Sequence, residues 1–416
     1  MSQAPLYDQA ARRAESPALI ALPQDVLNIE DKTRANLFSW RGQFSPQLAE
    51  ALIKNFAPSG CRVLDPFVGS GTVLLEAAKL GHPTIGTEIN PAAIYLARVY
   101  SLANVGRKNR RALLDRIDSD LDKALVGPLF LPRSGGNTNS RPALCALYQQ
   151  ARTKEDRILL GALIVTLDFY HRVPDRQRAL QYWGQLSGLV TELPEVDLPV
   201  AVRACDARRL PLAANSIQFV LTSPPYINVF NYHQNYRASV EALGWSLLEV
   251  ARSEIGSNRK HRQNRFLTVI QYCLDMASVF EELRRVCTRD AQLIFVVGRE
   301  SNVRKTAFYN GEIVKQLATR CGGFELGLRQ YRVFKNKFGR DIYEDVLHFS
   351  PGQFVKSVPV SPRLVAREIL TDALRRAPDE SRADLKDAVE RVAEVEPSPF
   401  FDVRRAFLPA RNNANG

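Results

Sequence analysis

The chain has 416 residues, of which 45% are hydrophobic and 24% are charged. This composition excludes global disorder and allows a sizeable core, in one large domain with additions or in two domains. The net charge of +12 favours a polyanionic partner, because Lys and Arg neutralise phosphates, although a well-solvated basic surface would give the same value.

Cysteine spacing and hydropathy exclude several classes of protein. The 6 cysteines form no Cys-X-X-Cys pair, so neither a zinc site nor a disulfide framework is predicted. The N-terminus lacks the apolar segment and cleavage site of a secretion signal. The longest apolar stretch, 159–167, is too short to cross a bilayer. We therefore expect a soluble cytoplasmic protein that binds no metal and no membrane.

Strands and helices alternate after a loosely structured arm over residues 1–40. The expected elements are a helix over 44–55, a buried strand that ends at Asp65, a helix over 73–80, a strand over 84–89 and a helix over 91–100. This order predicts a parallel sheet that is covered by helices.

The alternation stops at residue 104 and resumes at residue 199. Between them, the helical patterns and the polar break SGGNTNSRP predict a mostly helical insertion over 104–198. The expected elements after it are strands over 217–222 and 292–297, helices over 266–286 and 304–320, and a hairpin of 324–334 with 343–349. Residues 351–416 show helical spacing and are predicted to form a peripheral helical tail with a disordered end.

The segment DPFVGSGTVLLEA predicts a ligand-binding turn between a strand and a helix. The strand ends at Asp65, and Gly69 and Gly71 follow where a side chain would block a ligand that lies against the backbone. The third glycine of a dinucleotide fingerprint and the Gly-Lys-Ser/Thr of a P-loop are both missing. Neither a nicotinamide cofactor nor ATP is favoured, and a plain strand-to-helix turn would also use these glycines.

Two acidic residues follow at the ends of later strands. Glu88 lies about 20 residues past the glycine turn, where a carboxylate can bind both ribose hydroxyls of an adenosine. Asp206 follows the next predicted strand and can accept a hydrogen bond from the adenine amino group. Either residue alone is more typical of a solvated loop. Together with the glycine turn, they predict a site for adenosine attached to something other than pyrophosphate.

The tetrapeptide Ser223-Pro224-Pro225-Tyr226 directly follows the predicted strand over 217–222. Two prolines remove two backbone donors, so the segment forms a rigid loop rich in acceptors at the carboxyl end of a strand. An exocyclic amino nitrogen is a poor nucleophile, because its lone pair is delocalised into the ring. The Ser223 hydroxyl and the Pro224 carbonyl can hold its hydrogens, and Tyr226 can stack on a base flipped out of a duplex.

These two motifs resemble those of the DNA amino-methyltransferases, which act on cytosine N4 or adenine N6. DPFVGSG is similar to the cofactor loop of that family, and TSPPY is similar to its catalytic loop. The resemblance covers roughly 41–103 and 199–350, which we take as the catalytic core. It implies an α/β fold, the Rossmann-like class I methyltransferase fold with a mostly parallel seven-stranded sheet, and S-adenosylmethionine as the cofactor.

The resemblance also implies residue roles. Ser223, Pro224, Pro225 and Tyr226 would act at the target base. The residues that would bind the cofactor are Phe44, Asp65, Phe67, Gly69, Gly71, Thr72, Glu88 and Asp206. SPPY is more typical of cytosine N4 enzymes, so the implied activity is site-specific methylation of cytosine N4 in double-stranded DNA. Adenine N6 stays open, and a cognate restriction enzyme would be a natural partner in a restriction-modification system.

The element that reads DNA is left open between two segments, because many SPPY enzymes are circularly permuted and this chain is not. One is the insertion 104–198, with the basic stretches 107–111 and 171–178. The other follows the catalytic loop and contains a basic stretch over 256–265. Its candidates for the base pocket are Asn228, Asn231, Tyr232, Tyr236 and Arg237.

Features of the sequence argue against three rival activities. A 5-methylcytosine enzyme needs a nucleophilic cysteine, typically after proline, and the chain contains no Pro-Cys dipeptide. A tRNA guanine-N2 methyltransferase shares a similar glycine loop but usually has Asp in place of Ser223 and a separate RNA-binding domain. A nucleic-acid-binding protein without catalysis is the alternative from another class, and the intact appearance of both loops argues against it.

Overall fold

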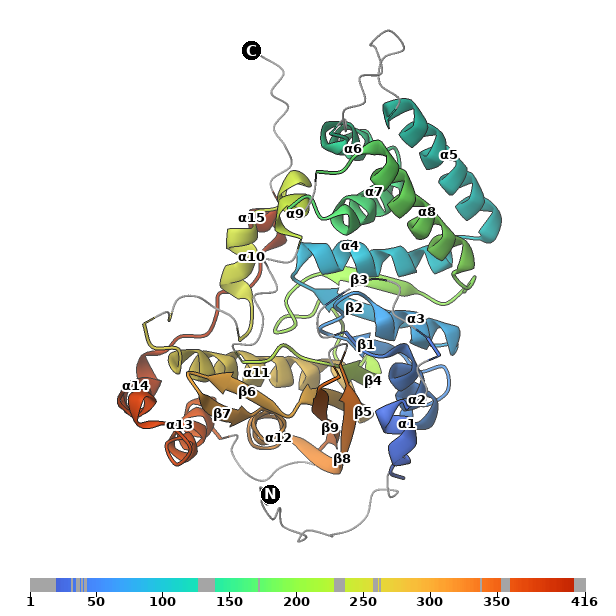
Figure 1. Ribbon diagram of the computed structural model, residues 1–416. Coiled ribbons are helices and arrows are strands. Elements are labelled where there is room, and N and C mark those ends of the chain that lie inside the picture. The colour runs from blue at the N-terminus through green and yellow to red at the C-terminus, as the bar shows by residue number, and fades with distance from the viewer. Residues whose placement is uncertain are drawn as a thin grey trace.

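The computed structural model describes residues 20–30, 33–34, 38, 40, 43–125, 139–170, 173–227, 236–256, 261, 263–336, 339–352 and 360–407. Within these residues, a seven-stranded sheet has the order β3-β2-β1-β4-β5-β9-β8 (Figure 1). Its strands are β1 (Val63–Asp65), β2 (Thr84–Glu88), β3 (Val200–Ala204), β4 (Ile217–Thr222), β5 (Cys287–Gly298), β8 (Phe324–Lys335) and β9 (Asp341–Pro351). Six of these strands run in one direction, and β9, between β5 and β8, runs in the opposite direction. The predicted α/β fold with a mostly parallel seven-stranded sheet is confirmed.

The strand order creates a switch point between β1 and β4. From β1 the chain moves outward to β2 and β3 on one side, and from β4 outward to β5 on the other. Connections therefore diverge on either side of the β1–β4 pair, which leaves a crevice at the carboxyl ends of these two strands. The loops that follow Asp65 and Thr222 lie at this crevice.

Helices cover both faces of the sheet. Val63 and Phe219 pack into the core beneath α2 (Pro46–Phe56), whereas Leu64 and Val220 pack into the core beneath α11 (Leu267–Val286). Successive residues of a strand point to opposite faces, so the residues at the centre of both strands are apolar on both faces. Helices α3 (Thr72–Lys79) and α4 (Pro91–Val99) follow β1 and β2 as the sequence predicts.

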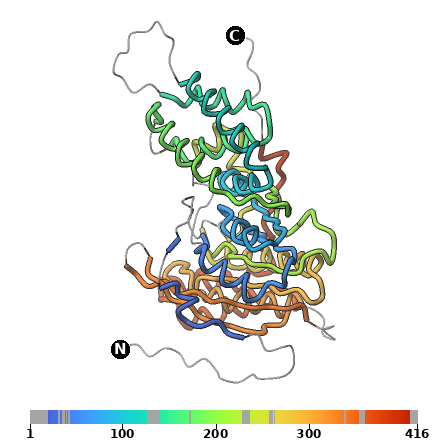
Figure 2. Tube along the Cα trace, turned by 90° about the vertical axis from the view of Figure 1, so that its right-hand side faces the viewer, coloured from blue at the N-terminus to red at the C-terminus, as the bar shows by residue number. Residues whose placement is uncertain are grey.

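Residues 107–192 contain four helices among the described residues, at the β3 edge of the sheet (Figures 1 and 2). They are α5 (Arg107–Leu125), α6 (Arg141–Gln149), α7 (Lys154–Leu167) and α8 (Arg176–Glu192). The apolar stretch 159–167 is the buried part of α7, which packs on α4. The Tyr95 and Tyr148 hydroxyls share a hydrogen bond between α4 and α6. Among the described residues, no helix has both the length and the apolar character needed to span a membrane.

The prediction of a helix over 304–320 is wrong in its first part. Residues 300–309 form a hairpin of β6 (Glu300–Val303) and β7 (Thr306–Tyr309), and α12 (Asn310–Arg320) begins only after it. Arg304 and Lys305 have φ of 49° and 63°, the backbone of a two-residue hairpin turn. Burial of Val303 and Phe308 favours the hairpin, and this long-range packing overrides the local helical spacing.

The C-terminal region is partly integrated into the core. Helices α13 (Pro362–Ala373) and α14 (Asp379–Glu390) bury Val365, Leu370 and Leu385 in the same cluster as α11. The 3-10 helix η4 (Arg391–Glu394) and the short α15 (Val403–Ala406) follow. The predicted peripheral tail is therefore a packed layer over 362–395, and the predicted disordered end, 411–416, lies outside the described residues.

Contact between α4 and α7 generates a stability prediction. A Cβ on Gly161 of α7 would lie 2.4 Å from the Tyr95 ring, so Gly161→Ala is expected to lower the free energy of unfolding by about 1–3 kcal/mol. The control is Gly184→Ala on exposed α8, where nothing lies within 4 Å. It should raise stability by about 0.5–1 kcal/mol, since alanine favours a helix over glycine. Urea titrations measure both, and equal effects would contradict the packing described.

Candidate functional site

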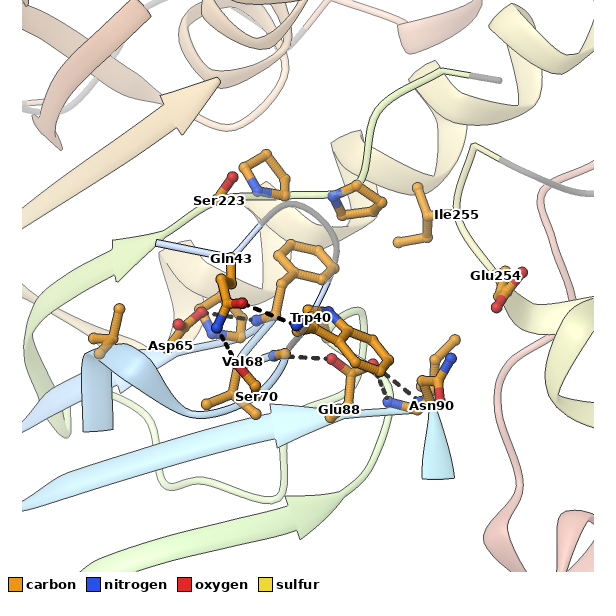
Figure 3. Close-up of a pocket in the computed structure, with 18 of the residues that line it drawn as sticks. Trp40, Gln43, Asp65, Val68, Ser70, Glu88, Asn90, Ser223, Glu254 and Ile255 are labelled. Atoms are coloured by element: carbon orange, nitrogen blue, oxygen red, sulfur yellow. Dashed lines mark hydrogen bonds between the residues drawn. The ribbon is translucent and has the colours of Figure 1, made fainter. Parts of the chain in front are cut away.

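A pocket opens at the switch point, between the carboxyl ends of the parallel strands (Figure 3). The turn after β1, the end of β2, the loop after β3 and the loop after β4 each contribute to its wall. All predicted cofactor and catalytic residues line it except Gly71. They are Phe44, Asp65, Phe67, Gly69, Thr72, Glu88, Asp206, Ser223, Pro224, Pro225 and Tyr226.

Asp65 joins the two predicted loops. Its Oδ1 accepts a 2.6 Å hydrogen bond from the Thr222 hydroxyl and a 3.0 Å bond from the Phe67 amide. Thr222 is the last residue of β4, directly before Ser223. Asp65 therefore holds the start of the catalytic loop against the turn that follows β1.

Glu88 organises the glycine turn. Its Oε2 accepts from the Gly69 amide at 3.1 Å, and its Oε1 accepts from the amides of Ile89 and Asn90 at 2.9 and 3.0 Å. Gly69 has φ of +50°, and a Cβ there would lie 3.3 Å from the Trp40 ring. The turn thus places Gly69 between the Glu88 carboxylate and an aromatic side chain.

Gly71 is required by packing within the protein. A Cβ at Gly71 would lie 2.6 Å from the Tyr100 ring and 3.0 Å from Ala97, and its φ of +95° already disfavours a side chain. It is not among the described residues that line the pocket. Its contact with the cofactor, which the motif predicts, stays a prediction.

Burial raises the pKa of both central carboxyls. Asp65 has its pKa raised to about 7, and Glu88 has its pKa raised to about 6, in each case chiefly because burial disfavours the charged form. Hydrogen bonds from Thr222 and from backbone amides oppose the shift without cancelling it. A cation bound beside them would favour their ionised forms.

Asp206 uses its acceptors within the protein. Oδ1 accepts from the Arg208 amide and Nε at 3.0 and 2.9 Å, and Oδ2 accepts from Arg208 Nη2 at 2.7 Å and the Phe401 amide at 2.9 Å. The carboxylate lines the pocket, but these four donors occupy its principal acceptor directions. Its hydrogen bond to an adenine amino group stays a prediction, and Arg208 competes for the same carboxylate oxygens.

The pocket is acidic. Four carboxyl side chains line it, those of Asp65, Glu88, Asp206 and Glu254, and none of the described lining residues is Lys or Arg. Arg208 offsets the charge of Asp206, and burial disfavours the charged forms of Asp65 and Glu88. The described lining nevertheless offers phosphates no cation and favours a ligand with net positive charge. Nicotinamide dinucleotides and ATP are therefore poor candidates, whereas a sulfonium with an amino group suits this electrostatic environment.

The Ser223–Tyr226 loop, which is predicted to be catalytic, carries a polar pair at its ends. The Ser223 and Tyr226 hydroxyls lie 3.2 Å apart, and the Tyr226 ring packs on Gly298, where a Cβ would lie 3.4 Å from it. Burial raises the pKa of Tyr226 to about 12, so its hydroxyl stays protonated. The predicted stacking of Tyr226 on a base would require a free ring face, and Gly298 already packs against this ring.

Sequence reasoning located one pocket segment in part and missed another. In the first, the resemblance singled out Phe44 but not its neighbours: Trp40 stacks on Tyr236 with ring centroids 6.3 Å apart, and the Gln43 amide donates to Ser70 Oγ at 3.2 Å. In the second, Ser253 at the end of α10 (Leu247–Ser253) lines the pocket from the opposite side, together with Glu254 and Ile255 after it. The SEIG segment carries no general chemical signal, so only the fold reveals it.

The nucleic-acid candidates are only partly described. Asn228, Asn231 and Tyr232 lie outside the described residues, as do most of 257–262 and residues 171–172. Tyr236 stacks on Trp40, and Arg237 pairs with Glu241 at 2.9 Å. Both described candidates therefore have partners within the protein.

A comparison with known protein families gives a match over the part of the chain that contains the glycine turn. Residues 19–99 match the N6/N4 methyltransferase family model, described as DNA methylase. These residues are therefore similar to the N6/N4 DNA methylases. The match agrees with the resemblance stated from the motifs, over residues 19–99.

Two curated relatives of this N6/N4 methylase segment match short regions. The type II methyltransferase M.MjaII of Methanocaldococcus jannaschii is 31% identical over 96 residues, which cover 23% of this chain and 18% of that protein. The tRNA (guanine(6)-N2)-methyltransferase of Thermus thermophilus is 44% identical over 98 residues, covering 21% of this chain and 29% of that protein. The matches therefore span less than a third of either relative.

Similar solved structures include an S-adenosylmethionine-dependent methyltransferase from Methanosarcina mazei, with 14% identity and a TM-score of 0.35, covering 73% of this chain and 98% of that one. A TehB-like methyltransferase from Corynebacterium glutamicum has 10% identity and a TM-score of 0.29, covering 73% and 86%. At these TM-scores, the assignment of the fold rests on the strand order described above.

The raised pKa values of Asp65 and Glu88 generate a prediction about pH. In the folded state both carboxyls hold their protons to a higher pH than their ordinary values of 3.8 and 4.5. The folded state therefore binds more protons than the unfolded state, and stability contributed by these groups falls as pH rises from about 4 to about 7. Asp65→Asn should flatten this fall, because Asn keeps an acceptor for Thr222 and Phe67 but carries no charge.

Urea unfolding of the cofactor-free protein between pH 5 and pH 8 measures this effect. The expected result is that Asp65→Asn gains stability relative to the wild type as pH rises. Asp115→Asn, on exposed α5, serves as the control and should leave the profile unchanged. A parallel profile for Asp65→Asn would contradict the raised pKa of Asp65.

Proposed function

We propose that the chain transfers a methyl group from S-adenosylmethionine to an exocyclic amino group of a nucleic-acid base, with cytosine N4 in double-stranded DNA as the substrate. The observation that carries the proposal is that the Ser223–Tyr226 loop lines the same pocket as the glycine turn. The glycine turn belongs to the segment that matches the N6/N4 family model. Bound S-adenosylmethionine supplies an electrophilic methyl group.

The residues of the pocket suit the binding part of this proposal. The Glu88 carboxylate and the Gly69 backbone would hold the ribose end, and Trp40 and Ile255 offer apolar surface to the adenine. The carboxyl of Asp65 would lie near the positive charges of the cofactor and offset them. Cofactor binding would in turn favour the charged forms of Asp65 and Glu88, whose pKa values burial raises.

The catalytic loop would position the amino group. Ser223 Oγ and the Pro224 carbonyl would accept its two hydrogens, which favours a more tetrahedral nitrogen with an available lone pair. The Tyr226 hydroxyl, held protonated by burial, can donate to Ser223 Oγ and so orient a Ser223 lone pair. Tyr226 would act through Ser223, with its ring braced by Gly298, and the base would stack elsewhere.

Guanine N2 of tRNA is the second candidate, and one observation favours it. The tRNA (guanine(6)-N2)-methyltransferase is 44% identical to this chain over 98 residues, a higher identity than the type II methyltransferase shows. Ser at position 223, more typical of cytosine N4 enzymes, favours DNA. Methylation of adenine N6 would use the same loop chemistry and would require only a different pocket for the base.

One incubation distinguishes these substrates. The protein is incubated with labelled S-adenosylmethionine and either mixed-sequence duplex DNA or tRNA, and the nucleic acid is digested to nucleosides that are identified by mass. N4-methylcytosine is the expected product. N6-methyladenine would change the base alone, N2-methylguanine in tRNA would replace the substrate, and the absence of transfer to either would overturn the proposal.

Ser223→Ala is expected to lower kcat by about 10–100-fold, because one acceptor of the amino hydrogens is lost. The dissociation constant of the cofactor should change by less than about twofold, since the catalytic acceptor faces the base. Ser216→Ala is the matched control, because the half-buried Ser216 directly precedes β4, at the end of the strand away from the pocket. Equal losses in turnover and cofactor affinity for Ser223→Ala would contradict the role of Ser223.

A further inference from the structure

Arg208 has a fully satisfied guanidinium in the protein interior. Its side chain is 1% exposed, and its hydrogen bonds employ all five N–H donors. Nε donates to Asp206 Oδ1 at 2.9 Å and Nη2 donates to Asp206 Oδ2 at 2.7 Å, which forms a bidentate pair. Nη1 donates to Asp275 Oδ1 at 2.6 Å.

The remaining donors of Arg208 bind the backbone near the C-terminus. Nη1 donates to the Ser398 carbonyl at 2.7 Å, and Nη2 donates to the Pro399 carbonyl at 2.8 Å. We call residues 396–402 the C-terminal strap; they connect η4 to α15 and pass alongside α10 (Figure 1). One buried side chain therefore ties the strap to two carboxylates that lie about 190 and 120 residues earlier in the chain.

The carboxylates bind the strap directly as well. The Ser398 amide donates to Asp275 Oδ1 at 2.9 Å, and the Phe401 amide donates to Asp206 Oδ2 at 2.9 Å. The Phe400 ring lies over the Arg208 guanidinium at 4.8 Å. Burial of these charges costs the folded state little free energy while the network is complete, but removal of one charge leaves its buried partners unpaired.

The segment after the strap supports the opposite wall of the pocket. The Ser246 amide donates to the Ala406 carbonyl at 2.7 Å, and Trp245 packs on Phe407 with ring centroids 5.1 Å apart. Ser246 precedes α10, and the residues after α10, Glu254 and Ile255, line the pocket. The loop that carries Asp206 and the helix that leads to Glu254 thus both rest on residues 396–407.

We propose that Arg208 is a positioning residue for cofactor binding: it docks the C-terminal strap against the Asp206 loop and thereby fixes this wall of the cofactor pocket. Asp206 is the anchor of the strap and does not select the adenine amino group. The inference rests on the proposed function for the identity of the ligand, while docking of the strap is independent of it.

Two variants and one control test the docking. Arg208→Lys keeps the positive charge but loses the bidentate fork and two of the five donors. Asp275→Asn is an isosteric change at a residue that does not line the pocket. It weakens the same network more gently, so the docking can still be tested if Arg208→Lys fails to fold. Arg289→Lys, on an exposed arginine near the start of β5 and away from the strap, is the matched control.

Hydrogen exchange of the strap and binding of S-adenosylhomocysteine are measured on the full chain. Arg208→Lys should accelerate exchange at 396–402 and weaken S-adenosylhomocysteine about tenfold or more. Asp275→Asn should do both to a smaller degree, and Arg289→Lys should do neither. Faster exchange with unchanged affinity would overturn the link between strap and pocket. Unchanged exchange in both variants would overturn the docking.

The role of Asp206 is tested with S-inosylhomocysteine, whose base lacks the adenine amino group. If Asp206 is an anchor, Asp206→Asn weakens both nucleosides by the same factor, and loss of the preference for adenine would overturn this assignment. If the wild type bound neither nucleoside, the proposed function and the cofactor role of Arg208 would both fail. Hydrogen exchange would still decide whether Arg208 docks the strap.

Discussion

The hydrogen bond from Thr222 to Asp65 is the interaction on which the site depends. It joins the ends of β1 and β4, the two strands between which the chain reverses its direction across the sheet. The glycine turn and the catalytic loop come from segments about 160 residues apart, and this buried bond of 2.6 Å fixes one against the other. A carboxyl placed here is costly to ionise, which is why burial raises the pKa of Asp65 to about 7.

Burial at the switch point has a second consequence for Glu88. Its carboxylate accepts three backbone amides and so holds the glycine turn in the geometry that leaves the pocket open. A bound cation would remove part of the electrostatic cost that both acids impose on the cofactor-free protein. Cofactor binding and the stability of the empty site are therefore linked through the same two carboxyls.

The central strands and their loops were predictable because their signals are local. β1 is a short apolar run that ends in Asp65, β4 is a mostly apolar run that leads into Ser-Pro-Pro-Tyr, and a strand buried on both faces leaves few other interpretations. Glu254 was not predictable, because it reaches the pocket through tertiary packing and carries no motif. The resemblance singled out Phe44 but not Trp40 or Gln43. Gly71 and Asp206 show the intermediate case: the pattern located them correctly, but Tyr100 explains the glycine and Arg208 engages the carboxylate.

Charge is divided between the pocket and the rest of the molecule. The chain carries a net charge of +12, yet the described lining of the pocket has four carboxyl groups and neither Lys nor Arg. A nucleic-acid backbone is attracted to the molecule as a whole and repelled from this pocket, whereas a sulfonium cofactor is favoured inside it. The Ser223–Tyr226 loop lines this pocket. Under the proposed function, a base freed from its strand would reach this loop while its phosphates stayed outside the acidic wall, so that one crevice would admit a cationic cofactor and a neutral base but no phosphate.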